Sequence, residues 1–210
     1  MDHIKTYYSS ELSFGDRTLI LEGPLSGQQI NDLDFHEGLI AFRSPERQKE
    51  ALISIADLPE GRINVARDGN MIIGYVTFVY PDPMERWSEG NMENLIELGA
   101  VEVAAEYRGA QVGKNLLRLS MRDDAMEDYI IITTEYYWHW DLKGSELSVW
   151  DYRKVMEKMM NAGGLVWYAT DDPEICSHPA NCLMVRIGKR VDMESIERFD
   201  RLRFNNRFMY

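Results

Sequence analysis

One short stretch of the chain, from Val101 to Lys114, combines small, basic and apolar residues in an order that suits anion binding. A predicted strand ends inside this stretch, and a turn with Arg108 and Gly109 follows. After Gly113 an amphipathic pattern predicts a helix. Glycine lets a backbone approach a ligand closely, and the first N–H groups of a helix point outward at the positive end of its dipole. The spacing therefore predicts a site for a pyrophosphate.

Three phosphate-binding motifs compete for this turn. A P-loop needs four residues between its first glycine and a Gly-Lys pair, with Ser or Thr next. Here three residues separate Gly109 from Gly113, and Asn115 follows the Gly-Lys pair. A dinucleotide-binding fingerprint, G-x-G-x-x-G early in a parallel sheet, is absent. The remaining fit is R-x-x-G-x-G starting at Arg108, with Gln111 at the first glycine of the motif.

This pattern resembles the acetyl-CoA turn of the GNAT superfamily of acetyltransferases. The matching residues read V-x-x-E-Y-R-G-x-x-V-G-K-x-L-L, and the resemblance extends roughly from Arg17 to Thr170. It implies a GNAT acyltransferase fold of the α/β (α+β) class, a mixed central sheet flanked by helices, and acetyl-CoA as co-substrate with no metal. The implied cofactor-binding residues are Val101, Val103, Arg108, Gly109, Ala110, Gln111, Val112, Gly113 and Lys114.

Longer segments resemble a narrower family, the acetoin-utilisation acetyltransferases of bacilli. These segments are YPDPMERWSEGNMENLIELGAVEV, TTEYYWHWDLKG and EKMMNAGGLVW, with RFMY at the end of the chain. The resemblance implies transfer of an acetyl group to a lysine of AMP-forming acetyl-CoA synthetase, which is thereby switched off. The expected partner is then a protein substrate, and the expected role is control of acetoin and acetate metabolism.

Two glutamates on the strand before the turn are candidate catalytic bases, Glu97 and Glu102. An attacking lysine must first lose a proton, because its unperturbed pKa is near ~10.4, and a carboxylate can take that proton directly or through a water. Glu97 precedes Arg108 by eleven residues, which resembles the catalytic glutamate of the histone-acetylating branch of the superfamily. The odd separation places the two glutamates on opposite faces of a regular strand, whereas a bulge near Gly99 would bring them to one face.

A third candidate base, Glu135, begins an aromatic run that continues to Trp140. Such rings could hold the stem of a lysine and favour its cation, and Tyr136 or Tyr137 could protonate the leaving thiolate. The same rings could instead pack in a core or at a dimer interface. Trp87 could likewise cap the acceptor site or anchor a long loop.

A metal site is a weaker possibility near the end of the chain. Cys176, His178 and Cys182 read C-x-H-x-x-x-C, which offers three ligands where a structural zinc site needs four at recognised spacings. We therefore expect no metal, and two reduced thiols rather than a disulfide.

The elements that must position these residues follow from hydrophobic periodicity and turn residues. A hairpin around Asp68-Gly69 is the clearest signal, and Ser44 with Pro45 predicts a helix start. We expect strands at 17–22, 63–66, 71–80, within 91–103, 129–134 and 165–170. We expect helices at 26–38, 45–56, 112–127, 149–161 and, after a helical start at 172, 193–204. This order predicts an N-terminal lead-in at 1–16, an acetyltransferase domain at 17–170 and a helical C-terminal extension at 171–210.

Composition excludes several classes of function. The 210 residues carry a net charge of −12, which disfavours nucleic acid as a partner. No apolar run approaches the ~18–20 residues that a membrane-spanning helix needs, and the first ten residues lack the apolar core of a secretory signal. We expect a cytoplasmic protein that binds neither nucleic acid nor membrane.

Three functions stay open on the sequence. The first is a protein lysine acetyltransferase, and the second is an acetyltransferase for a small amine, which would need an enclosed acceptor pocket. The third is a non-catalytic module that senses acetyl-CoA and holds a partner. The presence of both Glu97 and Glu102 favours a catalyst over the third.

Overall fold

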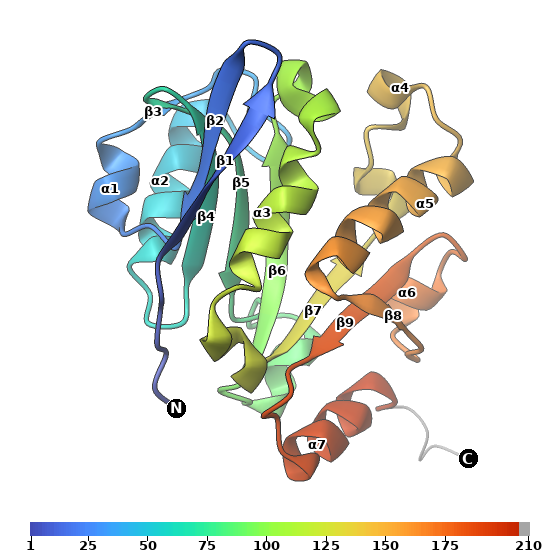
Figure 1. Cartoon of the computed structure of the whole chain (residues 1–210). Helices are drawn as coiled ribbons and strands as arrows, with labels where there is room; N and C mark the ends of the chain where they lie inside the picture. The colour runs from blue at the N-terminus through green and yellow to red at the C-terminus, as the bar shows by residue number, and fades with distance from the viewer. Residues whose placement is uncertain (206–210) are drawn as a thin grey trace. The chain divides into compact units, whose positions relative to one another are not determined.

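The computed structural model describes residues 1–205, which separate into two compact units. Unit 1 consists of Met1–Tyr80 and Glu97–Met126, and unit 2 consists of Pro81–Ile96 and Glu127–Tyr210. Each unit contains strands with helices beside them (Figure 1), which agrees with the α+β class expected from the sequence. The RFMY segment used in the sequence comparison, residues 207–210, lies outside the described residues.

Unit 1 is built on a mainly antiparallel sheet with the order β1-β2-β4-β5-β6, and the short β3 runs parallel to β5. Its strands are β1 (Tyr8–Phe14), β2 (Arg17–Gly23), β3 (Asp34–Phe35), β4 (Arg62–Asp68), β5 (Met71–Val79) and β6 (Leu95–Val103). Residues from Glu97 onward in β6 belong to this unit. The predicted hairpin is confirmed, because β4 and β5 pair on either side of the Gly69 turn.

Helices cover both faces of the unit 1 sheet. They are α1 (Gly27–Asn31), α2 (Pro45–Ala56) and α3 (Val112–Ser120), with 3₁₀ turns η2 (Ala105–Ala110) and η3 (Asp124–Asp128). The Asn64 amide on β4 donates to the Ser120 hydroxyl of α3 at 2.8 Å, so α3 packs on the face that Asn64 shares. Figure 1 shows α2 on the other face. The predicted start of α2 at Pro45 after Ser44 is confirmed.

A buried ion pair accounts for the early end of α3, which the sequence predicted to continue to residue 127. Arg62 on β4 donates to the Asp123 carboxylate at 3.1 Å, and both side chains are buried. Asp123 also accepts from the backbone N–H of Thr6, and Arg62 donates to the carbonyl of Ile4 at 2.6 Å. Asp123 makes these contacts from the turn that follows Ser120.

Unit 2 has a three-stranded antiparallel sheet with the order β7-β9-β8. Its strands are β7 (Ile130–Glu135), β8 (Val166–Tyr168) and β9 (Cys182–Ile187). Its helices are α4 (Leu142–Ser145), α5 (Val149–Met160), α6 (Pro173–Cys176) and α7 (Met193–Arg203), with 3₁₀ turns η1 (Arg86–Gly90), η4 (Tyr137–His139) and η5 (Asn161–Gly163). Its core includes Trp87, Ile130, Leu183 and Phe199.

Besides the end of α3, three expectations about the elements are wrong. Strand β1 lies inside the segment 1–16 that was expected to be a lead-in. Strand β9 lies inside the segment 171–210 that was expected to be helical, because a short buried apolar run cannot be assigned by periodicity alone. The helix expected at 26–38 ends at Asn31, and β3 follows it. The predicted domain boundaries stay a prediction.

Candidate active site

The predicted strand–turn–helix is present in unit 1. Strand β6 ends at Val103, the 3₁₀ turn η2 follows, and α3 begins at Val112. The N–H of Ala104 donates to the carbonyl of Ile73 at 2.9 Å, which holds the exit of β6 against β5. The first backbone bond that closes α3 runs from Asn115 N–H to the carbonyl of Gln111 at 3.1 Å. The N–H groups of the first helical turn before it therefore have no intrahelical partner, as at any helix start.

The turn offers positive charge and open backbone beside this helix start. Arg108 and Gly109 are exposed, and Lys114 is half-buried in the first turn of α3. A Cβ added to Gly109 would meet no heavy atom within 4 Å, so the space above its backbone is open. Free N–H groups, the dipole of α3 and two cations are the components of an anion site.

Gln111 links η2 to α3 with left-handed backbone angles, φ 56° and ψ 30°. Glycine adopts these angles freely, whereas an L residue with a side chain loses about 1–2 kcal/mol there. The R-x-x-G-x-G motif has glycine at this position, and the left-handed conformation explains why. With glutamine in place of glycine, the turn keeps its left-handed backbone and gains an exposed side chain.

The bulge needed to place both glutamates on one face is present at Gly99. In the β5–β6 ladder, Phe78 pairs with Leu98 and Thr77 pairs with Ala100, so Gly99 is the extra residue. Glu97 pairs with Val79, and Glu102 pairs with Tyr75. Val79 and Tyr75 are four residues apart on a regular strand and share a face, so Glu97 and Glu102 share it too. It is the face opposite α3, because Asn64 pairs with Val76.

The Glu102 carboxylate is buried, with 6% of the residue exposed, and both of its oxygens accept hydrogen bonds. The N–H of Ala41 donates to Oε1 at 2.7 Å, and the Tyr75 hydroxyl donates to Oε2 at 2.5 Å. Burial, and then the bond to Glu102, raise the pKa of Tyr75 far above its ordinary value. Glu102 therefore ties the loop 36–44 to the sheet, and Tyr75 keeps its proton at all physiological pH values.

Two features of this site were missed at the sequence level, the Tyr75 partner of Glu102 and the loop around Ala41. Both contacts cross large sequence separations, 27 and 61 residues. The hairpin signal around Gly69 locates Tyr75 on β5, but only the register against β6 shows that it lies opposite Glu102. Glu97 is half-buried on the same strand.

Glu135 ends β7 in unit 2 and has its own polar partners. Its carboxylate accepts from the indole N–H of Trp140 at 3.1 Å and from the Thr133 hydroxyl at 3.5 Å. Burial raises the pKa of Glu135 to about 7, and these two hydrogen bonds only partly oppose the shift. The side chain is therefore a carboxyl that exchanges its proton near neutral pH.

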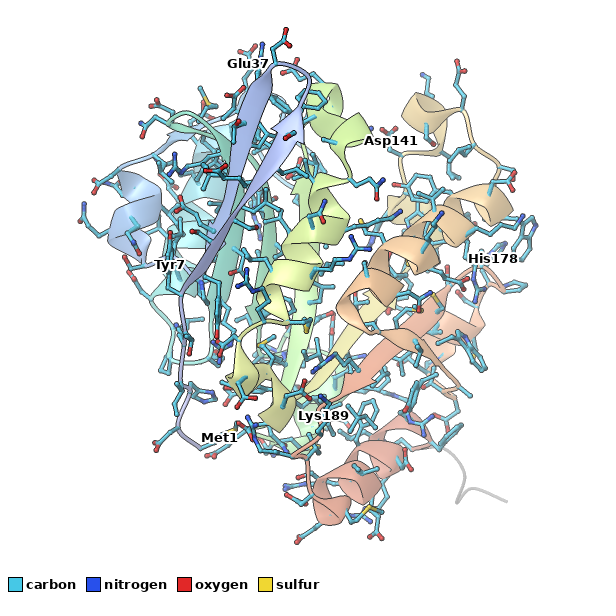
Figure 2. The ribbon with its side chains drawn as sticks, viewed as in Figure 1. Met1, Tyr7, Glu37, Asp141, His178 and Lys189 are labelled. Atoms are coloured by element: carbon cyan, nitrogen blue, oxygen red, sulfur yellow. The ribbon has the colours of Figure 1, made fainter. Side chains whose placement is uncertain are left out.

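The aromatic run after Glu135 forms stacked pairs within unit 2. Tyr136 stacks on Trp138 with ring centroids 4.9 Å apart, and Tyr137 lies 4.1 Å from the ring of His178, which Figure 2 labels. Trp138 remains 47% exposed. These rings are therefore neither a closed core nor isolated surface residues. Trp87, in contrast, is buried in the core of unit 2 beside Phe199, so it anchors its loop.

Comparison with known proteins identifies the family. The sequence model of the acetyltransferase (GNAT) family matches residues 33–136. The acetoin utilization protein AcuA of Bacillus subtilis is 65% identical, and that of Bacillus licheniformis is 67% identical, each over 100% of both chains. The crystal structure of an acetoin utilization protein from Exiguobacterium sibiricum superposes with a TM-score of 0.95 at 61% identity, covering 99% of this chain and 98% of that one.

The chain belongs to the GNAT family of acetyltransferases. Its fold and its class of activity, acetyl transfer, are those of the family, whose members use acetyl-CoA as the acetyl donor. The turn between β6 and α3 stands at the motif that the sequence analysis matched to this donor.

The structure places the two cysteines and His178, and it describes which groups and helices are present in residues 1–205. Cys176 is exposed and Cys182 is buried on β9, while His178 stacks on Tyr137. Within residues 1–205, no group of three or more His, Cys, Asp or Glu side chains is arranged to hold a metal ion. No helix in that range has the length and apolar character needed to cross a membrane.

Proposed function

We propose that this acetyltransferase transfers the acetyl group of acetyl-CoA to a lysine of a protein, AMP-forming acetyl-CoA synthetase, and thereby inactivates it. The observation that carries the proposal is the 65–67% identity, over the full length of both chains, to proteins named for acetoin utilization. A role in the use of acetoin implies a link to acetate and acetyl-CoA metabolism. The proposed acceptor is an enzyme of that metabolism, as the resemblance of the sequence suggests.

The turn after β6 is the proposed site for acetyl-CoA. The first N–H groups of α3, Arg108 and Lys114 suit its pyrophosphate, and the open backbone at Gly109 leaves room for close approach. The proposed contacts are Val101, Val103, Arg108, Gly109, Ala110, Gln111, Val112, Gly113 and Lys114. Val101 and Val103 lie on the last part of β6, directly before the turn.

Glu97 and Glu102 are the proposed catalytic residues. A carboxylate takes one proton from the lysine ammonium, either directly or through a water. The lysine nitrogen then forms a bond to the acetyl carbonyl carbon as the carbon–sulfur bond breaks. The nitrogen releases its second proton, and the departing thiolate takes up a proton, so charge and atoms balance.

The two glutamates are suited to different parts of this task. Glu102 already accepts from Ala41 N–H and the Tyr75 hydroxyl, so its orientation is fixed. Its bond to the protonated Tyr75 holds the carboxylate in place and does not relay a proton. Glu97 shares its face and is only half-buried, so the residue is partly accessible to solvent. We therefore assign Glu97 as the base and Glu102 as the residue that orients the site.

Release of free coenzyme A thiol tests the acceptor class. The enzyme and acetyl-CoA are incubated in parallel reactions with different acceptors. One reaction contains purified acetyl-CoA synthetase, and the others contain free lysine or small diamines. The proposal predicts one thiol released per synthetase chain and no release above background with the free amines. Turnover with the amines and none with the synthetase would show that the protein is a small-amine acetyltransferase instead.

A further inference from the structure

Tyr107 joins the turn after β6 to two hairpins that are distant in sequence. Its hydroxyl donates to the Asp68 carboxylate at 2.9 Å and accepts from the Arg17 guanidinium at 3.1 Å. Arg17 also donates to Asp68 at 2.8 Å, which closes the group into a triangle. Arg17 begins β2 and Asp68 ends β4, so the turn is fixed to the ends of two strand pairs.

The Tyr107 ring is held as firmly as its hydroxyl. Only 6% of the residue is exposed. The ring lies 5.4 Å from that of Phe14 at the end of β1, and the His36 ring meets it edge-on at 6.0 Å. Because ring and hydroxyl both have partners, η2 cannot shift without breaking contacts to several strands.

The neighbouring residue provides a second anchor for η2. The Glu106 carboxylate lies 2.5 Å from His36 Nε2. The N–H of Gly38 donates to His36 Nδ1 at 3.0 Å, so the neutral ring carries its hydrogen on Nε2 and donates it to Glu106. This bond ties η2 to the loop at His36.

The other end of the turn is anchored from α3. The carbonyl of Gln111 accepts both the backbone N–H of Asn115, at 3.1 Å, and its side-chain amide, at 3.2 Å. Gln111 has left-handed backbone angles that an L residue keeps only when its surroundings hold it. Between the two anchors, Arg108 and Gly109 are exposed. The turn is thus fixed at both ends and open in the middle, where an anion would bind.

We infer that Tyr107 is a positioning residue that sets the affinity for acetyl-CoA, by holding the turn in its binding shape through Asp68 and Arg17. The inference rests on the proposed function of the turn as the acetyl-CoA site. A loop that is already ordered loses little conformational entropy when a ligand binds, so its affinity is higher than that of a loop that must first be ordered. The partners of the Tyr107 hydroxyl, Asp68 and Arg17, are not among the proposed catalytic residues.

The test is Tyr107→Phe, which keeps the ring and its packing and removes the hydroxyl. Acetyl-CoA binding is measured by titration calorimetry, and kcat and KM are measured with acetyl-CoA varied. A hydrogen bond to a charged group contributes enough that its loss should raise Kd and KM for acetyl-CoA by about 5- to 20-fold. The kcat at saturating acetyl-CoA should stay the same. A merely structural role would lower the unfolding temperature without this split between KM and kcat.

A matched control is Tyr7→Phe in the same unit. The Tyr7 hydroxyl donates to the Glu22 carboxylate at 2.6 Å, far in sequence from the turn. Its loss removes a tyrosine–carboxylate bond of the same kind and should leave Kd for acetyl-CoA unchanged. Asp68→Asn is a second variant, which should raise Kd in the same direction and should not add to Tyr107→Phe in the double variant.

The outcomes separate this inference from the proposed function. An unchanged Kd in Tyr107→Phe and Asp68→Asn would overturn the inference, and so would an equal loss of affinity in Tyr7→Phe. If the unaltered enzyme binds acetyl-CoA but does not acetylate the synthetase, the proposed acceptor fails while the Kd comparison still decides the role of Tyr107. If the unaltered enzyme does not bind acetyl-CoA, both are contradicted.

Discussion

At the residue scale, the proposed chemistry depends on where two carboxylates lie. Glu97 and Glu102 are five positions apart, and only the extra residue at Gly99 places them on one face of β6. Glu102 is fixed by two donors from different elements, Ala41 and Tyr75. This geometry supports separate roles for two residues of one chemical type, since their surroundings differ.

The first prediction concerns Glu97. Glu97→Gln keeps the size of the side chain and removes the base, so kcat should fall by about 100- to 10,000-fold, the usual contribution of general base catalysis. Kd for acetyl-CoA should be unchanged, because the proposed site for acetyl-CoA is the turn. Steady-state kinetics with titration calorimetry checks both. A kcat within a few-fold of the unaltered enzyme would remove Glu97 from the mechanism.

The second prediction concerns Glu135 and pH. Its pKa is about 7 in the folded protein and near its ordinary 4.5 in the unfolded chain, so the folded state binds the proton more tightly. Through this group, the free energy of unfolding falls as pH rises from about 4.5 to about 7 and is constant above that range. Glu135→Gln has no such group and should be more stable than the unaltered protein at pH 8, by on the order of 2 kcal/mol.

Urea unfolding at pH 5 and pH 8 measures this difference. Glutamine still accepts the Trp140 indole N–H through its amide oxygen, so the substitution removes the charge and keeps the hydrogen bond. If the stability difference between the two proteins is the same at both pH values, Glu135 has no raised pKa.

At the scale of elements, the start of α3 is the proposed binding site for acetyl-CoA. The turn η2 and the left-handed Gln111 connect β6 to this helix start. The sequence predicted this arrangement correctly from Arg108, Gly109 and Gly113. The left-handed position of Gln111 could be anticipated only from the motif glycine that it replaces.

The third prediction concerns Gln111 itself. Gln111→Gly removes the steric cost that a side chain has at left-handed backbone angles. It also raises the conformational entropy of the unfolded chain, which opposes the gain. The net effect should be a gain in stability of about 0.5–1 kcal/mol. Chemical denaturation checks this prediction, with Gln28→Gly in α1 as a control that should be destabilised because its backbone is helical. A loss of stability in Gln111→Gly would contradict the left-handed conformation.

The fourth prediction concerns the ion pair that ends α3. Arg62 and Asp123 are buried together, so removing one partner leaves an uncompensated charge. Asp123→Ala should destabilise unit 1 by about 3–5 kcal/mol, well above the effect of removing an exposed pair. Asp151→Ala, which removes the exposed pair with Lys154, is the matched control and should change stability far less than Asp123→Ala does. Similar effects in both variants would contradict the buried pair.

At the scale of the whole molecule, the sequence predicted what depends on local patterns and missed what depends on distant partners. The β4–β5 hairpin, α2 and α5 were predicted closely, because turn residues, caps and periodicity are local signals. Strands β1 and β9 were missed, since each is defined by pairing to a neighbour rather than by its own residues. The candidate site shows the same division between local and distant contacts.

The turn was predicted from residue types and spacing, and the bulge near Gly99 that places Glu97 and Glu102 on one face was anticipated. The catalytic roles of the two glutamates stay a prediction. The partners that hold them, Tyr75 for Glu102 and Asp68 for Tyr107, lie on other strands and are seen only in the fold. The acceptor and the acetyl-CoA contacts stay predictions, supported by the family and by the chemistry of the turn.

Intact-mass analysis of purified acetyl-CoA synthetase shows whether this enzyme acetylates it. The synthetase is incubated with acetyl-CoA and either the unaltered enzyme or the Glu97→Gln/Glu102→Gln double variant, and its activity is measured alongside its mass. The account predicts the gain of a single acetyl group with loss of synthetase activity, and neither change with the double variant. No gain in mass with an enzyme that binds acetyl-CoA, or inhibition that persists with the double variant, would contradict it.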